Sequence, residues 1–174
     1  MPQLTFLFDS SLCSGCFSCV VACQDQNDFA GNDIAFRKVT AYESGQYPDA
    51  IISYVSTACF HCGDAPCIMV CPTGAISKNL NNGIVTVNRE VCVSCHSCEL
   101  ACPFGSPKFA DDGHMIKCDM CSTGLDNAMI PACARACPTG ALGIGTLDEV
   151  SELKTKEASI KILGSFTMSR PIKR

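Results

Sequence analysis

The sequence predicts an α+β fold in which short helices and β-hairpins surround bound inorganic groups. Three observations predict it. Sixteen of the 174 residues are cysteines, and they fall into four groups of four. In every group the third and fourth cysteines are four residues apart, a spacing that places both on one face of a short helix. Turn signals separate short β-branched segments between the groups, which indicates hairpins.

Each group has the spacing of an iron-sulfur ligand set. The first and third groups read C-x2-C-x2-C-x3-C, the second C-x2-C-x4-C-x3-C and the fourth C-x2-C-x11-C-x3-C, and the last three end in proline. In chain order the groups are Cys13, Cys16, Cys19 and Cys23; Cys59, Cys62, Cys67 and Cys71; Cys92, Cys95, Cys98 and Cys102; and Cys118, Cys121, Cys133 and Cys137. This pattern is typical of two-cluster bacterial ferredoxins, where the fourth cysteine serves the other cluster. Four groups therefore predict four [4Fe-4S] clusters and indicate electron transfer.

Disulfides and zinc are the other uses of so many cysteines. Disulfide scaffolds are typical of small secreted chains, but residues 1–9 show no basic n-region, apolar h-region or cleavage site. Paired C-x2-C units also bind zinc. Zinc requires neither the further cysteines of the tight groups nor the following proline, so the pattern favours iron-sulfur clusters.

Composition and charge agree with this interpretation. Without its cysteines the chain is only about 38 % apolar, below the usual share of a globular domain, so the apo-protein should be poorly folded. Residues 1–153 carry 7 basic and 16 acidic side chains, and residues 154–174 carry 6 and 1. The acidic body argues against nucleic acid as a partner. The basic tail either docks on a partner, folds back on the body or is a solvated terminus.

The chain contains no uninterrupted apolar stretch of 18 residues, so we expect it not to span a membrane. Without a signal peptide it is expected to be cytoplasmic, with export alongside a partner as the alternative.

The segments between the groups predict the remaining elements in order. An apolar segment, residues 4–8, precedes the first group. Residues 36–42 and 51–55 are expected to be strands separated by a turn-rich segment. Asn82-Gly83, between short β-branched segments, is a strong hairpin signal within residues 76–88. Residues 137–144 repeat the first half of that pattern after the fourth group.

The end of the chain predicts one longer helix. Thr146 to Glu149 form a capping box that should open a helix reaching about Lys156. The apolar stretch Ile160–Leu163 is expected to be either a strand or an element that binds a partner.

The cysteine spacing also predicts how each short helix ends. A helix can deliver the third cysteine to one cluster and the fourth towards its neighbour, and the following proline stops it. Gly74, Gly105 and Gly140 follow soon after these prolines. They suit backbone passing close to inorganic sulfide, and ordinary turns are the alternative.

Together these features predict a ferredoxin-like fold with two nested units of two clusters each. The outer unit comprises residues 1–30 and 110–150, and the inner unit residues 59–109. Residues 31–58 supply connecting strands, and residues 151–174 a helix and basic tail available for partner docking.

The motifs resemble the four-cluster electron-transfer subunits of the dimethyl sulfoxide reductase family. The resemblance rests on the segments 59–75, 98–109, 117–121 and 130–138, in that order, and covers roughly residues 4–150. It implies a partner subunit with a molybdopterin or tungstopterin, anaerobic metabolism, and relay of electrons to or from an anchor, quinone site, flavoprotein or soluble carrier. Some members have tryptophan and a [3Fe-4S] cluster in the third group, whereas Cys95 implies [4Fe-4S] here.

With the nested order, the resemblance also implies four ligand sets. They are Cys13, Cys16, Cys19 with Cys137; Cys118, Cys121, Cys133 with Cys23; Cys59, Cys62, Cys67 with Cys102; and Cys92, Cys95, Cys98 with Cys71. Each fourth cysteine then belongs with a distant group.

Two departures from the family widen the choice of partner. Ser122-Thr123-Gly124 stands where an Asp-Arg pair is common, and the long carboxy-terminal extension of many relatives is missing. The alternatives are a subunit of a tungsten aldehyde oxidoreductase complex that self-associates into a chain of clusters, and an independent soluble polyferredoxin.

No catalytic residues are predicted. The sequence has no P-loop, and its glycines at 140, 143 and 145 have the wrong spacing for a dinucleotide fingerprint. His61, His96 and His114 are candidates to tune a cluster by a hydrogen bond, with packing or solvent exposure as the alternative. Catalysis is therefore expected in another subunit.

Overall fold

Small antiparallel sheets and mostly short helices make up the α+β structure, a computed structural model that describes residues 3–29, 34–125 and 127–168. The α+β class with short helices and hairpins is confirmed. In chain order the elements are β1 (Leu4–Phe8), α1 (Ser18–Gln26), β2 (Lys38–Ser44), β3 (Ile51–Thr57), α2 (Pro66–Met69), β4 (Ile76–Lys78), β5 (Val85–Val87), a 3-10 turn (Arg89–Val91), α3 (Ser97–Ala101), β6 (Lys108–Phe109), β7 (Met115–Ile116), α4 (Ser122–Leu125), α5 (Ala132–Arg135), β8 (Leu142–Thr146) and α6 (Leu147–Met168).

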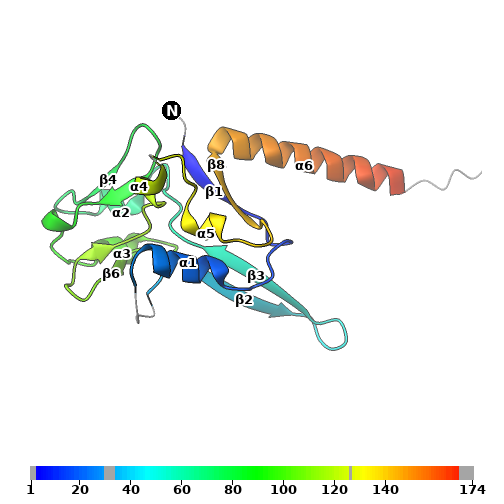
Figure 1. The fold of residues 1–174 in the computed structure, drawn as a ribbon, viewed down its shortest axis with the longest axis horizontal. Coiled ribbons are helices and arrows are strands. Elements are labelled where there is room, and N and C mark those ends of the chain that lie inside the picture. Colours follow the sequence, from blue (N-terminus) through cyan, green and yellow to red (C-terminus); the bar gives the residue numbers. More distant parts are fainter. Residues whose placement is uncertain (1–2, 30–33, 126, 169–174) are drawn as a thin grey trace, which may run out of the picture.

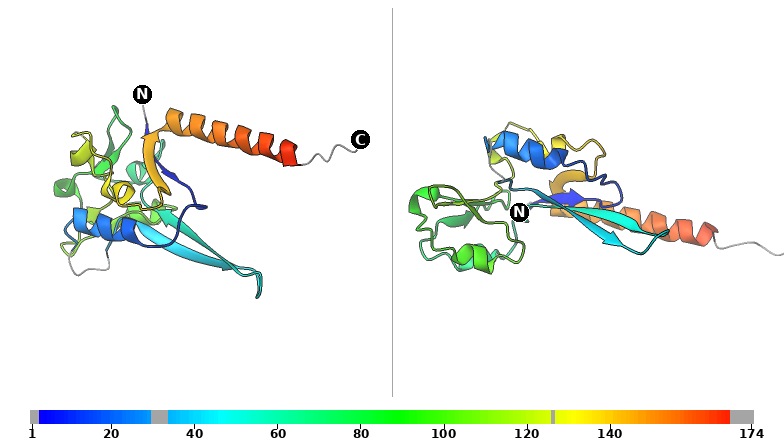
Figure 2. Two further views of the ribbon diagram at one scale, coloured as in Figure 1. Left: turned by 45° about the vertical axis from the view of Figure 1, so that its right-hand side comes forward. Right: turned by 90° about the horizontal axis from the view of Figure 1, so that it is seen from below.

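The elements gather in two neighbouring groups (Figure 1). Helices α2 and α3 lie with β4 to β7 on one side, and α1, α5, β1 and β8 lie beside them. The β2–β3 hairpin and α6 project from the second group, away from α2 and α3, in all three views (Figures 1 and 2).

Strands β1 and β8 pair although they are far apart in the sequence. Their antiparallel register runs from Leu4 opposite Thr146 to Phe8 opposite Leu142. The backbone N–H of Asp9 extends the pairing by donating to the carbonyl of Ala141 at 2.8 Å. This sheet places the segment before the first cysteine group beside the segment after the fourth.

The predicted hairpin within residues 76–88 is confirmed, and the two strands expected near residues 36–42 and 51–55 are present and pair with each other, the first of them beginning at Lys38. Strand β4 pairs with β5, with Ile76 opposite Val87, around a loop that contains Gly83 at a φ of 74°. Strand β2 pairs with β3, and both strands extend two residues further than predicted at their C-terminal ends. The pair β6 and β7, which flanks the turn at residues 111–114, was not predicted because two-residue strands are too short to show alternation.

The expectation that one short helix carries the third and fourth cysteines of a group is met only by α1, which contains Cys19 and Cys23. Helices α2, α3 and α5 each contain the third cysteine of a group and end before the fourth, which precedes a proline. Helix α1 runs past Cys23 to Gln26, since Gln24 rather than proline follows that cysteine. Proline thus accounts for which helices stop.

Helix α6 corrects two predictions. The capping box is confirmed, because Thr146 N donates to Glu149 Oε2 at 2.8 Å and Glu149 N donates to Thr146 Oγ1 at 3.3 Å. The predicted end at about Lys156 is wrong, since the helix reaches Met168. Of the two expectations for Ile160–Leu163, the strand is also wrong, because that stretch lies inside the helix.

No glycine or proline interrupts residues 147–163, so nothing in the sequence stops the helix where the prediction ended it. No helix in the described residues is both long and apolar enough to cross a membrane. The basic residues Arg170, Lys173 and Arg174, predicted as a docking tail, lie outside the described residues.

The core is built around cysteines. One apolar cluster joins Ile76, Val85 and Met115 to Cys67 and Cys98. A second cluster joins Leu142 and Ala134 to Cys133, with Phe6 and Phe8 packed against it. Conventional apolar side chains therefore contribute only part of each core.

Candidate iron-sulfur sites

The first and third cysteine groups adopt the same local backbone. Gly15 and Ser94 have φ values of 68° and 55°, and Phe17 and His96, each just before a helix, have 61° and 60°. A left-handed residue between successive cysteines reverses the direction of the backbone. Cysteine side chains three residues apart can then face a common centre.

The second cysteine of each of these loops is exposed and hydrogen-bonded to a serine. Cys16 Sγ lies 3.4 Å from Ser18 Oγ, and Cys95 Sγ lies 3.5 Å from Ser97 Oγ. The serine side chains lower the pKa of both thiols. Such an environment favours the thiolate, which is the form that binds metal.

The second and fourth groups form another matching pair. His61 and Met120 occupy the third position of their C-x2-C loops, with φ values of 47° and 62°, and both side chains are fully buried. A left-handed third position is thus common to all four loops, whereas only the first and third groups add a left-handed residue, Phe17 or His96, directly after the second cysteine.

The fourth cysteines of the second and fourth groups lie in identical turns. Gly74 N donates to Cys71 O, and Gly140 N to Cys137 O, both at 3.4 Å. Burial raises the pKa of each thiol, but hydrogen bonds from the threonine two residues on and from nearby backbone N–H groups outweigh it, so both pKa values are lowered. Gly74 and Gly140 have φ values of 66° and 67°, which supports the interpretation of these glycines as turn residues.

Three small cavities are each lined by four cysteines. Their cysteines are Cys13, Cys16, Cys19 and Cys137 in one cavity; Cys23, Cys118, Cys121 and Cys133 in another; and Cys71, Cys92, Cys95 and Cys98 in the third. In each cavity three thiols come from one group and the fourth from a different group.

The remaining four cysteines are Cys59, Cys62, Cys67 and Cys102. Burial raises the pKa of Cys67, and negative charge on Cys59 and Cys102 raises it further. Helix α2, which contains Cys67, packs against α3, whose C-cap is Cys102. Cys62 packs against the same apolar cluster as Cys67.

The donor chemistry of these sites fits iron-sulfur clusters. All sixteen cysteines are free, and twelve of them line the three cavities, as required when each iron of a cluster takes one thiolate. In the described part of the chain, no three His, Cys, Asp or Glu side chains converge on the position of a single metal ion. Burial raises the pKa of Cys118 to about 12, so this thiol becomes an anion only beside a strong positive charge, such as a metal.

The three histidines have different surroundings. His61 Nδ1 accepts a hydrogen bond from Val85 N at 2.9 Å, and burial, followed by the charge of Lys117, lowers the pKa of His61 to about 3. Its buried Nε2 has no partner among the described protein atoms. His96 stacks on Phe109 with the ring centroids 3.7 Å apart, and His114 Nδ1 is buried without a described partner.

Two buried cations beside the cysteines were missed by the sequence reasoning. Arg37 was treated only as part of a strand, and Lys117 only as part of a motif. A lysine placed between Ile116 and Cys118 was the available signal, since both neighbours are typically buried residue types.

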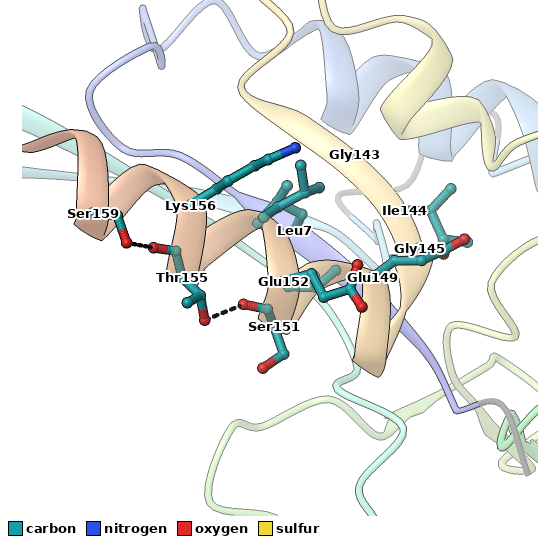
Figure 3. Close-up of a pocket in the computed structure, with 12 residues that line it drawn as sticks. Leu7, Gly143, Ile144, Gly145, Glu149, Ser151, Glu152, Thr155, Lys156 and Ser159 are labelled. Carbon is teal, nitrogen blue, oxygen red and sulfur yellow. Dashed lines mark hydrogen bonds between the residues drawn. The ribbon is translucent and has the colours of Figure 1, made fainter.

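A further hollow has no cysteine in its lining. It measures about 850 Å³ and lies between α6 and the β1–β8 sheet, where Leu7, Gly143, Glu149 and Lys156 line it (Figure 3). The hydroxyls of Thr155 and Ser159 bond back to helix carbonyls at 2.9 Å and are not turned to a ligand. We assign this hollow no part in cluster binding.

Substitution of Gly15 by alanine is expected to lower stability markedly. Its φ is 68°, and a Cβ there would lie 2.4 Å from the Tyr54 ring of β3. The left-handed conformation costs about 1–2 kcal/mol and overpacking about 1–3 kcal/mol more. Gly113→Ala is the matched control, because Gly113 has a φ of 80° but its Cβ would come no closer than 3.5 Å to Ser94. Gly15→Ala should lose its cluster absorbance at the lower temperature on heating, and equal temperatures would contradict the clash.

Comparison with known proteins places the protein among iron-sulfur proteins. A 4Fe-4S dicluster domain matches residues 50–147. The B subunit of the anaerobic dimethyl sulfoxide reductase of Haemophilus influenzae is 38% identical over 181 residues, covering 98% of this protein and 87% of the relative. The B subunit of the Escherichia coli K12 enzyme is 34% identical over 178 residues, covering 97% and 86%. Protein NrfC of E. coli K12 is 39% identical over 156 residues, covering 83% and 68%.

Proposed function

The chain belongs to the iron-sulfur electron-transfer subunits of the dimethyl sulfoxide reductase family, and we propose that it relays electrons through four [4Fe-4S] clusters between a pterin-containing catalytic subunit and a second redox partner. Subunits of this kind carry electrons and leave catalysis to another subunit. When bound, the clusters supply one-electron carriers, and the residues of this chain hold and shield them.

Four ligand sets follow, which we call sites one to four. Site one is Cys13, Cys16, Cys19 and Cys137; site two is Cys23, Cys118, Cys121 and Cys133; site three is Cys59, Cys62, Cys67 and Cys102; and site four is Cys71, Cys92, Cys95 and Cys98. The single observation that carries this assignment is the lining of sites one, two and four, each by four thiols from two different groups.

Sites one and two form an outer unit and sites three and four an inner unit. In support, α1 packs against α5 and β1 pairs with β8 in the outer unit, whereas α2 packs against α3 in the inner unit. The inner unit also contains the β4–β5 hairpin.

Electrostatic contacts between cysteines support the order of the sites along the relay. Charge on Cys133 of site two raises the pKa of Cys19 in site one, after the effect of burial. Charge on Cys59 of site three acts in the same way on Cys118 of site two. Charge on Cys67 of site three also raises the pKa of Cys98 in site four. These interactions support the order one, two, three, four for the proposed sites.

The ends of this order reach the surface. Cys16 of site one and Cys95 of site four are exposed. Apolar side chains are exposed close to them in the sequence, among them Phe17 and Val21 near Cys16 and Val93 near Cys95. Exposed apolar groups beside a redox site suit docking of partner proteins. We therefore place electron entry and exit at sites one and four.

Purification of the affinity-tagged protein from its native cells under anaerobic conditions tests the proposal. A polypeptide containing molybdopterin or tungstopterin should co-purify, and the tagged protein itself should hold about sixteen iron and sixteen sulfide, four of each per cluster. Recovery of the tagged protein alone with all its clusters would favour an independent polyferredoxin. Full-occupancy zinc without acid-labile sulfide would refute the cluster assignment.

A further inference from the structure

Arg37 and Lys117 are buried cations without a carboxylate partner. Their side chains are 2% and 5% exposed, and they are the only buried charged residues among those the structure describes. The ion pairs found in the described ranges join other residues, all of them at the surface. A buried charge is costly unless an opposite charge compensates it, so both positions require negative charge nearby.

Lys117 lies between sites two and three. Its ammonium donates to the backbone carbonyls of Val85 and Cys118, the latter at 2.7 Å. These bonds hold the charge between β5 and the fourth cysteine group. Cys118 belongs to site two, and Val85 packs in the same apolar cluster as Cys67 of site three, so the ammonium stands between the two sites.

Arg37 lies between sites one and two. Its Nη1 donates to Ser56 Oγ at 3.1 Å, and that oxygen is 3.6 Å from Cys19 Sγ in site one. The guanidinium stands 4.5 Å from the centre of the Phe6 ring, and both residues line the cavity of site two. Its Nε and Nη2 are buried and have no acceptor among the described protein atoms, so these two donor nitrogens remain for a ligand in these sites.

We propose that Arg37 and Lys117 are redox-tuning residues, which together raise the reduction potential of the cluster in site two, the one site that both flank. Reduction adds a negative charge to the cluster, and a nearby cation stabilises the reduced form more than the oxidised form. This attraction is strong because the surroundings are buried and screen poorly. Clusters with thiolate ligands are anionic, and so they supply the charge that the two cations lack.

Each cation also affects one further site. Arg37 raises the potential of site one, and Lys117 that of site three, whereas neither lines the cavity of site four. Arg37 and Lys117 flank site two from different sides, so both raise its reduction potential. The inference rests on the proposed cluster sites and predicts a pattern across them that their existence alone does not require.

EPR-monitored redox titration of the anaerobic complex tests it with the variants Arg37→Met and Lys117→Met. Both should lower the midpoint potential of the signal that Cys118→Ser perturbs. Arg37→Met should also lower the site-one potential, and Lys117→Met the site-three potential, while site four keeps its value in both. The matched control is Lys78→Met. The Lys78 ammonium also donates to two backbone carbonyls, of Cys62 and Gly63 at 3.0 Å, but it is partly exposed and screened by water.

An unchanged site-two potential in either variant would overturn the inference, as would an equal fall in Lys78→Met. If a methionine variant does not retain its clusters, the same titration is made on Arg37→Lys or Lys117→Arg. Each keeps the charge and should therefore keep the site-two potential near its original value, and a marked fall would contradict electrostatic tuning. A wild-type complex with fewer than four cluster signals would refute the proposed function itself.

Discussion

Removal of iron and sulfide is expected to unfold the protein, apart from part of α6. Helices α2, α3 and α5 have only four or five residues, far below the about 12–15 that an isolated helix requires in water. All four described sheets have two strands, and isolated hairpins are marginally stable at best. The short elements therefore depend on the groups that they surround.

The cysteines supply the physical reason for this dependence. They are members of both described apolar clusters and line cavities, so removal of iron and sulfide leaves these thiols without the groups that they bind. When no site exists in the unfolded state, the free energy of metal binding is also free energy of folding. Helix α6, with 22 residues and a capping box, is the element least dependent on the clusters.

Far-UV circular dichroism and amide hydrogen exchange measure the effect after anaerobic chelation. The apo-protein should lose protection in β1 and β8 and keep residual helix signal from α6. Reconstitution with iron and sulfide should restore the original spectrum and protection, which serves as the control for irreversible damage. Retention of β1–β8 protection in the apo-protein would show that the protein core suffices without clusters.

Local signals predicted the elements that depend on neighbouring residues. The Asn82-Gly83 turn predicted the β4–β5 hairpin, and Thr146 with Glu149 predicted the start of α6. The prolines predicted that α2, α3 and α5 are short, although each helix ends before the fourth cysteine of its group and not at the proline. Each of these features is decided within a few residues, and so the sequence pattern contains it.

The features that depend on distant contacts were not predicted. Burial of Arg37 follows from Phe6 and Ser56, which are far from it in the sequence, and burial of Lys117 depends on its bond to Val85. The length of α6 was underestimated because the β-branched residues Ile160 and Ile162 suggested a strand, although no helix stop precedes them. Helix α6 nevertheless continues through both isoleucines, so their preference for strands did not decide the local structure.

Cys23→Ser is expected to abolish or alter the signal of one cluster, and that cluster is not the one nearest in sequence. Cys23 belongs to the first cysteine group but lines a cavity with Cys118, Cys121 and Cys133. Helix α1 carries Cys19 and Cys23 one turn apart, and Cys19 lines a different cavity, with Cys13, Cys16 and Cys137. A serine oxygen is a poorer ligand than thiolate for iron-sulfur clusters, so loss of one thiolate changes the cluster that it served.

EPR spectra of the reduced variants Cys23→Ser, Cys118→Ser and Cys16→Ser, recorded on the anaerobic complex, test this crossed ligation most directly. We expect Cys23→Ser and Cys118→Ser to perturb the same signal, while the signal perturbed by Cys16→Ser stays intact in both. If Cys23→Ser instead perturbs the signal that responds to Cys16→Ser, each group closes its own cluster, and the nested arrangement of the four sites is wrong.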